Sequence, residues 1–202
     1  MTSRSTHSIV NVGYRSTNYW VVGATKSRLL VDIGWPGTLG TMKAALKRMG
    51  VPVSEIRYAL ATHYHIDHAG LAEEIKREGV SLLVIEVQCP ATPIMKSWTK
   101  PADNYIEITD AGNVTITIGE SRPFLAQLGI VGQILHTPGH SDDSVSLLLD
   151  DGSVFTGDLP PEEVCWDNPR ALASWRLLRE AGATRVYPAH GPTRQVGDEV
   201  PG

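Results

Sequence analysis

THYHIDH, residues 62–68, holds three histidines and one aspartate within six positions. It follows a short apolar run at residues 56–61 that predicts a strand, and a helix is predicted from residue 71. Because side chains alternate along extended backbone, His63 and His65 point to the same side and can share one ion. Asp67 and His68 follow where the chain turns into the helix, so they can face a second position beside the first. The stretch is either a polar loop with coincidental histidines or half of a metal site.

Four ligands are too few for two ions, so the rest of the chain must supply more. Three further candidates each follow a predicted strand: His140 in TPGHSDDS, Asp158 in FTGDL and His190 in PAHGP. Strand-end loops are where sheet proteins display functional groups. Imidazole and carboxylate donors suit zinc, and also iron or manganese. Asp158 can bridge two ions through its two oxygens, which would complete two adjacent sites.

The pattern of predicted elements indicates an α+β fold. Strands are predicted at residues 18–22, 28–33, 56–61, 81–87, 114–118, 132–136, 144–149, 153–156 and 185–188, and helices at residues 38–49, 71–78, 120–128 and 169–181. They repeat in two similar halves, about 1–100 and 101–202, of a single domain. Such a pattern suits two sheets packed face to face with helices outside. Residues 88–107 show no clear period and predict a surface loop or lid, and His7 is expected in an N-terminal tail.

Composition narrows the partners. The 202 residues are 42% hydrophobic and 20% charged with a net charge of −4, which is typical of a globular protein long enough to bury a core. Without a run of lysine or arginine, nucleic acid is not expected as a partner, and no apolar stretch is long enough to span a membrane. The N-terminus has no signal-peptide core, and Cys89 and Cys165 form no CxxC pair, so the cytoplasm is the expected compartment. A small molecule is the expected substrate, and a homodimer is compatible with these features.

The ordered set HxHxDH, TPGH, GD and AHG, with TNYWVV and LLVDIG upstream, resembles the metallo-β-lactamase-fold hydrolase superfamily from about residue 18 to residue 190. The resemblance implies a four-layer αββα sandwich with the metals at one edge of the two sheets. It implies a first metal held by His63, His65 and His140, a second held by Asp67, His68 and His190, and Asp158 bridging both. Asp32, in VDIG, resembles a position that supports the metal loop from behind the ligands.

Departures from individual branches narrow the implied activity. True β-lactamases generally lack the bridging aspartate that Asp158 supplies, and diiron flavoproteins carry an acidic residue where His65 stands. Glyoxalase II and the acyl-homoserine lactonases share the full ligand set. Glyoxalase II, however, usually has a helical extension where only residues 191–202 follow here, and the lactonases often have a tyrosine shortly after the bridging aspartate, where Leu159-Pro160-Pro161 stand.

The resemblance therefore implies a dinuclear zinc hydrolase, in which a metal-bridging hydroxide oriented by Asp67 attacks a small ester, lactone, thioester or phosphoester. One alternative is a mononuclear iron dioxygenase of the same fold that oxidises persulfides. Another is a non-catalytic metal-binding protein, which is disfavoured because structural zinc sites are closed and usually rich in cysteine. Several other residues are open to either a pocket role or simple packing: Trp35, Tyr64, Trp98, Cys165 and Trp166. His136 is expected at a strand end or behind the ligands.

Overall fold

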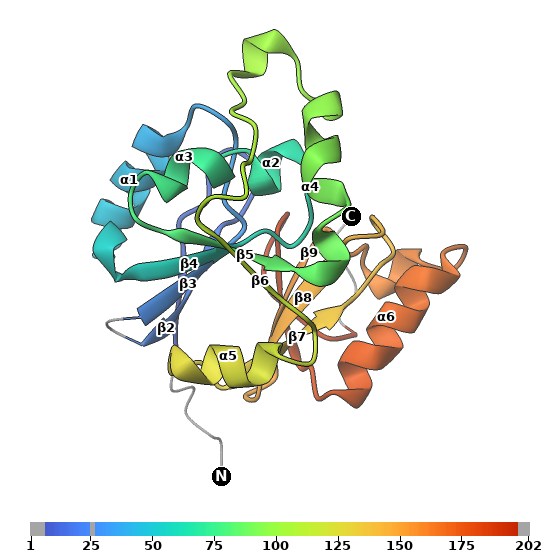
Figure 1. Cartoon of the computed structure of the whole chain (residues 1–202). Helices are drawn as coiled ribbons and strands as arrows, with labels where there is room; N and C mark the ends of the chain where they lie inside the picture. The colour runs from blue at the N-terminus through green and yellow to red at the C-terminus, as the bar shows by residue number, and fades with distance from the viewer. Residues whose placement is uncertain (1–6, 25–26, 198–202) are drawn as a thin grey trace.

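The computed structural model describes residues 7–24 and 27–197, whose strands form two mixed sheets (Figure 1). The first has the order β1 (Ser8–Asn11), β2 (Trp20–Ala24), β3 (Ser27–Val31), β4 (Ile56–Leu60), β5 (Ser81–Ile85) and β6 (Asn113–Ile116). The second has the order β11 (Arg194–Gln195), β10 (Arg185–Pro188), β9 (Ser153–Gly157), β8 (Val145–Leu149) and β7 (Gly132–His136). Strands β3 to β6 run parallel, as do β9 and β10, and the other pairs are antiparallel.

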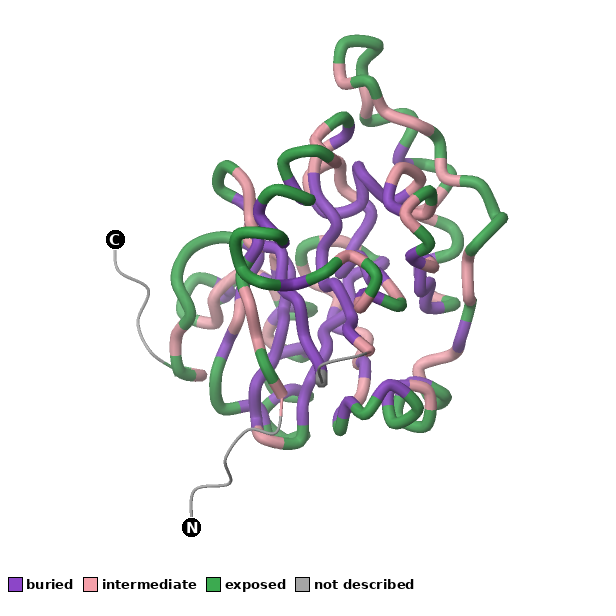
Figure 2. Tube along the Cα trace, turned by 90° about the vertical axis from the view of Figure 1, so that its left-hand side faces the viewer, coloured by how far each residue is buried: buried purple, intermediate pink, exposed green. Residues whose placement is uncertain are grey.

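Helices cover the outer face of each sheet. In Figure 1, α1 (Leu39–Arg48), α2 (Ile66–Ala69) and α3 (Ala72–Lys76) lie on the first sheet, and α6 (Pro169–Glu180) lies on the second. The helix α5 (Ser121–Gln127) contributes Leu125 to the core between the sheets. Figure 2 shows the buried residues gathered in the middle of the molecule, with exposed segments around them. The arrangement is the predicted four-layer αββα sandwich.

Alternation along the strands explains the layers. In β3, Leu29 and Val31 belong to the core between the two sheets, whereas Leu30 packs on the side of α1. In β8, Leu147 faces the first sheet and Leu148 packs with Trp175 of α6. Because successive side chains of a strand point to opposite faces, a strand that is buried on both faces reads as a continuous apolar run. Runs such as SLLVI in β5 therefore sit between a helical layer and the second sheet.

The N-terminal segment differs from the prediction. Residues 8–11 form β1, which pairs antiparallel with β2, and His7 lies against the turn after α5. The Nε2 atom of His7 is 3.2 Å from the carbonyl oxygen of Gly129 and accepts a hydrogen bond from the backbone N–H of Val131 at 3.1 Å. The prediction of a tail at His7 is therefore wrong. A four-residue edge strand carries too little periodicity to be recognised before its partner is known.

The segment between β5 and β6 is the second difference. It holds η2 (Glu86–Gln88), α4 (Ala91–Ile94), η3 (Met95–Trp98) and η4 (Pro101–Asp103), and it projects at the top of Figure 1. These turns are too short to show helical periodicity, so the predicted surface loop contains short helical turns that the sequence did not indicate. Met95 is fully buried in the core under α1 to α3 and anchors the segment. Two further short turns are η1 (Val53–Glu55) and η5 (Glu162–Val164).

Across the described residues, no helix has both the length and the apolar character that crossing a membrane requires.

Candidate metal centre

The seven predicted ligands meet at one edge of the sandwich, where four strands end. His63 and His65 follow β4, and Asp67 and His68 lie on α2 directly after them. His140 lies in the loop between β7 and β8, Asp158 follows β9, and His190 follows β10. Their ligand atoms form three overlapping groups, within each of which the atoms lie no more than 4.8 Å apart. Segments about 130 residues apart in sequence thus build one cluster.

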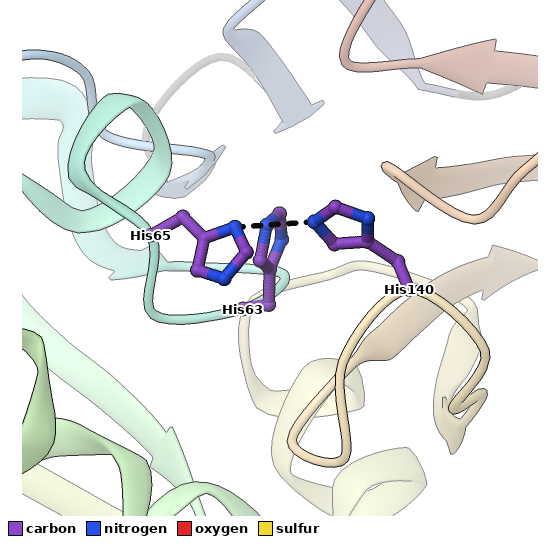
Figure 3. A group of neighbouring side chains, drawn as sticks. All are labelled: His63, His65 and His140. Atoms are coloured by element: carbon purple, nitrogen blue, oxygen red, sulfur yellow. Dashed lines mark hydrogen bonds between the residues drawn. The ribbon is translucent and has the colours of Figure 1, made fainter. Parts of the chain in front are cut away.

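The first group contains His63, His65 and His140, whose rings converge from two loops (Figure 3). The Nε2 atom of His140 is 3.1 Å from the Nδ1 atom of His65. The ring centroid of His63 lies 4.4 Å from that of His65 and 4.7 Å from that of His140. Three imidazoles that face a common point are a typical ligand set for a transition-metal ion.

The second group contains Asp67, His68 and His190. The Oδ2 atom of Asp67 lies 3.5 Å from Nε2 of His68 and 3.4 Å from Nε2 of His190. Asp67 and His68 are neighbours on α2, which begins at Ile66, and a ligand atom of each reaches this position. The group has two imidazoles and one carboxylate, a donor set that zinc, iron and manganese all accept.

Asp158 lies between the two groups. Its Oδ2 atom is 3.8 Å from Nε2 of His63 and 3.6 Å from Nε2 of His140, both in the first group. The same oxygen is 3.3 Å from Nε2 of His68, and the Oδ1 atom is 3.3 Å from Nε2 of His190. One carboxylate therefore reaches ligand atoms of both groups, which is the placement expected of a bridging ligand.

Hydrogen bonds set which ring nitrogen faces the centre. The Nδ1–H of His190 donates to the carbonyl oxygen of Ser16 at 2.8 Å, and a carbonyl can only accept, so Nε2 carries the lone pair. The hydroxyl of Thr62 donates to Asp32 at 2.8 Å, which leaves its oxygen to accept from Nδ1 of His63 at 3.2 Å. In their neutral forms both histidines thus turn the lone pair of Nε2 toward the centre.

Asp32 supports His68 from behind. Its Oδ2 atom lies 3.2 Å from Nδ1 of His68, and its Oδ1 atom accepts hydrogen bonds from the backbone N–H and the hydroxyl of Thr62, each at 2.8 Å. Asp32 adopts a φ of 61°, a left-handed conformation that is uncommon outside glycine and asparagine. A carboxylate fixed in this way holds the ring of His68 and the start of the histidine loop together.

The pKa values show where the cluster favours charge. Burial lowers the pKa of His63 well below its ordinary value, and neighbouring histidines lower it further. Burial has the same effect on His140, where it outweighs the attraction of Asp158. Burial also opposes protonation of His68, but Asp32 and Asp158 prevail and raise its pKa to about 10. The pKa of Asp158, in contrast, is lowered, because its contacts with His68 and the other histidines outweigh the effect of its burial. The carboxylates therefore favour positive charge between the two groups.

Unpartnered buried atoms test whether the site fits metal ions. Within the described residues, eight buried side-chain polar atoms form no hydrogen bond, and three of them, Nε2 of His63, Nε2 of His68 and Oδ1 of Asp158, are candidate ligand atoms. A buried polar atom without a partner is costly, and most such atoms in folded proteins are satisfied. All three are ligand atoms of the cluster, so metal coordination would supply the partner that each lacks. The residues present therefore fit a pair of divalent ions.

Sequence reasoning missed two residues that hold the histidine loop. The backbone N–H of Tyr64 donates to Oδ2 of Asp143 at 2.8 Å. Gln88 is fully buried, and its amide donates to the carbonyl oxygens of Ala61 at 3.0 Å and Thr62 at 3.3 Å. Its Oε1 atom accepts from the N–H of Ile85 at 3.2 Å. The one sequence signal was a glutamine directly after an apolar strand, which by itself predicts only a strand end.

The loops of His140 and His190 are held by side chains from elsewhere in the chain. Asn168, which caps α6, donates to the carbonyl oxygen of Gly139 at 2.8 Å. Asn18 donates to the carbonyl oxygens of Pro188 and Gly191, on either side of His190. His136 lies at the end of β7, and its Nε2–H donates to the carbonyl oxygen of Asp142 at 2.8 Å. Both ligand loops are therefore tied down at their backbones.

The other residues that the sequence left open to a pocket or a packing role lie in different surroundings. Tyr64 and Trp98 line a cavity of about 470 Å³ that borders His65. Trp35 is half-buried, and Trp166 is 82% exposed. Cys165 is buried and its thiol donates to the carbonyl oxygen of Pro161 at 3.1 Å. Cys165 therefore packs on the backbone under η5 and does not reach the cluster of ligand atoms.

The chain belongs to the metallo-beta-lactamase superfamily, whose model matches residues 12–190. It is 26% identical to a beta-lactamase-like protein 2 homolog of Caenorhabditis elegans over 88% of this chain and 57% of that protein. It is 27% identical to the probable metallo-hydrolase MJ0888 of Methanocaldococcus jannaschii over 93% of this chain and 92% of that protein. The chain thus spans little more than half the length of the first relative and nearly all of the second.

Solved structures share the fold. A metallo-beta-lactamase family protein from Thermus thermophilus superposes with a TM-score of 0.72 at 20% identity, covering 94% of this chain and 75% of that one. The protein TTHA1623, solved in a di-iron-bound form, superposes with a TM-score of 0.70 at 23% identity, covering 94% of each chain. The predicted family and the αββα fold are confirmed.

Proposed function

We propose that this chain is a metal-dependent hydrolase with a dinuclear centre, occupied by zinc, that acts on a small ester, lactone, thioester or phosphoester. The observation that carries the proposal is the position of Asp158, whose Oδ2 atom is 3.8 Å from Nε2 of His63 and 3.3 Å from Nε2 of His68. We assign His63, His65 and His140 to one ion and Asp67, His68 and His190 to the other, with Asp158 shared. When bound, the two ions would activate water at neutral pH, polarise the substrate oxygen and stabilise the leaving group.

The chain's own residues prepare this chemistry. We assign to Asp67 the additional role of accepting a hydrogen bond from the attacking water and orienting it. Its Oδ2 atom accepts a hydrogen bond from the hydroxyl of Thr17 at 2.9 Å, which fixes the carboxylate. The lowered pKa values of His63 and His140 favour their neutral forms, which would offer lone pairs to a bound ion. No serine or cysteine nucleophile is needed, and the sequence contains no GxSxG motif.

Metal content and activity test the proposal together. The purified chain is expected to contain about two metal ions, with zinc as the main element, and to hydrolyse at least one substrate in a panel of simple esters, lactones, thioesters and phosphodiesters. We expect His65→Ala to lower both the metal content and kcat/KM, the latter by more than about 100-fold, because loss of a supporting residue alone costs 10–100-fold. His7→Ala is the control, since His7 lies against the turn at Gly129.

The same measurements distinguish the alternatives. Because TTHA1623 shares the fold and was solved in a di-iron-bound form, iron must be quantified beside zinc. One iron per chain with persulfide-dependent oxygen uptake would replace the hydrolase proposal with the dioxygenase. A protein that stays folded after chelation but loses its activity would argue against a structural role for the metal.

A further inference from the structure

The cavity that borders His65 has a distinct chemical character. It measures about 470 Å³, and six of its lining residues are apolar or aromatic: Tyr64, Val87, Pro90, Ala91, Ile94 and Trp98. Substrate pockets are usually lined in this way, with a few polar groups that fix orientation. A smaller cavity of about 220 Å³ borders His140, Asp158 and His190. The metal-ligand cluster therefore has a large apolar cavity beside one ion site and a smaller cavity beside the shared carboxylate.

Two large side chains on this wall are not used for packing. Ile94 is 53% exposed and Trp98 is 68% exposed, and they are four residues apart on the continuous helical segment formed by α4 and η3. Both side chains line the same cavity. The centroid of the Trp98 ring lies 6.4 Å from that of His65, a proposed ligand. The exposed apolar surface thus lies beside the reaction centre.

The two aspartates and the serine that line the cavity already interact with other residues of the chain. Asp143 accepts from the backbone N–H of Tyr64 at 2.8 Å, and Asp142 pairs with Arg170 at 2.5 Å. Ser141 lies 2.8 Å from the hydroxyl oxygen of Ser144. Neither lysine nor arginine lines the cavity, and two carboxylates do. Apart from the proposed ions, the lining residues offer an anionic group no cationic side chain, and most of the wall is apolar, so the cavity favours an uncharged apolar group.

We infer that this cavity binds the apolar acyl group of an uncharged carboxylic ester or lactone, with Trp98 packed against it as the main specificity-determining residue. This inference rests on the proposed hydrolase function. Water adds to the carbonyl carbon, the acyl C–O bond breaks, the leaving alkoxide takes one proton, and the product acid releases another to solvent. The acyl group stays beside His65 during this step, so the contact with Trp98 favours esters with a bulky apolar acyl chain.

Methyl esters test the inference because their leaving group is small and constant. The substrates are methyl acetate, methyl 4-phenylbutanoate and the anionic monomethyl ester of suberic acid, followed by acid release. The metal-loaded wild-type chain is expected to prefer the phenylbutanoate over both others. Trp98→Ala is expected to lower the ratio of kcat/KM for phenylbutanoate to that for acetate by about tenfold, because it removes the apolar surface against which the longer acyl chain packs. Its metal content is expected to match that of the wild type.

A matched control and a binding measurement keep the outcomes separate. Trp166→Ala removes a tryptophan that is 82% exposed and does not line the cavity, so it is expected to leave the ratio unchanged. Calorimetry with the unreactive N-methyl-4-phenylbutanamide is expected to show binding that Trp98→Ala weakens and Trp166→Ala does not. If esters are hydrolysed but Trp98→Ala leaves the ratio at its wild-type value, the inference is overturned and the hydrolase proposal stands.

The opposite failure is also informative. If no member of the panel of esters, lactones, thioesters and phosphodiesters is hydrolysed but the amide binds in a manner that depends on Trp98, the hydrolase proposal fails and the apolar cavity is supported. If no member of that panel is hydrolysed and the amide does not bind, both are overturned.

Discussion

Asp32 and His68 form a fully buried pair in which the Oδ2 atom of Asp32 lies 3.2 Å from Nδ1 of His68. With metal bound, a carboxylate at this distance would keep a proton on Nδ1 and leave Nε2 of His68 for the proposed second ion. We expect Asp32→Asn to weaken metal binding by about 10–100-fold, the usual effect of removing such a carboxylate. A competition titration with a chelator measures the affinity. Asp142→Asn, at a side chain that is 87% exposed, is the control. Unchanged affinity in Asp32→Asn would show that Asp32 serves only to hold Thr62.

We expect Gln88 to stabilise the fold independently of metal binding. Its buried amide satisfies the carbonyl oxygens of Ala61 and Thr62 and the N–H of Ile85. Gln88→Leu keeps the approximate size but removes these hydrogen bonds, and only the Thr62 carbonyl keeps a second partner, the N–H of Val145 at 2.8 Å. The free energy of unfolding is therefore expected to fall by about 1–3 kcal/mol. Urea unfolding of the metal-free protein measures the change. Gln127→Leu, at an exposed position ending α5, is expected to have little effect.

The pKa of His68 predicts a pH dependence for the metal-free protein. A folded-state pKa of about 10, above the ordinary value of 6.5, contributes stability that is complete below pH 6.5 and declines as the pH rises toward 10. The lowered pKa of His63 acts in the opposite sense, since unfolding at pH values below 6.5 lets this residue take up a proton. Stability is therefore expected to be greatest near neutral pH.

Denaturant unfolding between pH 5 and pH 9 checks this expectation about ionisation. His68→Asn is expected to flatten the decline above neutral pH, because it removes the group that loses its proton there. A decline of equal slope in this variant would assign the alkaline arm to another group.

We expect a side chain at position 157 to disturb the candidate metal centre by steric overlap. It has a φ of 57°, and a Cβ atom at this position would lie 2.3 Å from the hydroxyl oxygen of Thr62, which bonds both Asp32 and His63. We expect Gly157→Ala to destabilise the protein by about 1–3 kcal/mol through this overlap and to lower its metal content. The matched control is Gly50→Ala, which has a φ of 69° but open space around it, so it isolates backbone strain. Equal losses in the two variants would contradict a steric role for Gly157.

Local patterns were enough to predict most of the fold. The double-sided burial of β3, β5 and β8 appears in the sequence as continuous apolar runs, and glycines mark the ends of several helices. The edge strand β1 and the turns of residues 86–103 were not predictable in this way. Each is only three or four residues long, so its conformation depends on the strand or core residue against which it packs.

The candidate ligands were identifiable because each lies in a short motif at a strand end, where residue type and order carry the information. The residues that hold the ligand loop in place were not identifiable from the sequence. Gln88 and Asp143 bind backbone groups of residues 61–64, and no motif marks a residue that acts in this way. The same holds for Trp98, which is remote from the ligands in sequence and reaches His65 only because Met95 anchors its segment in the core. Residue identity and order settle which donors the chain possesses. Only tertiary packing decides that Asp158 reaches both groups, since this depends on ångström-scale distances between strands of the folded sheets.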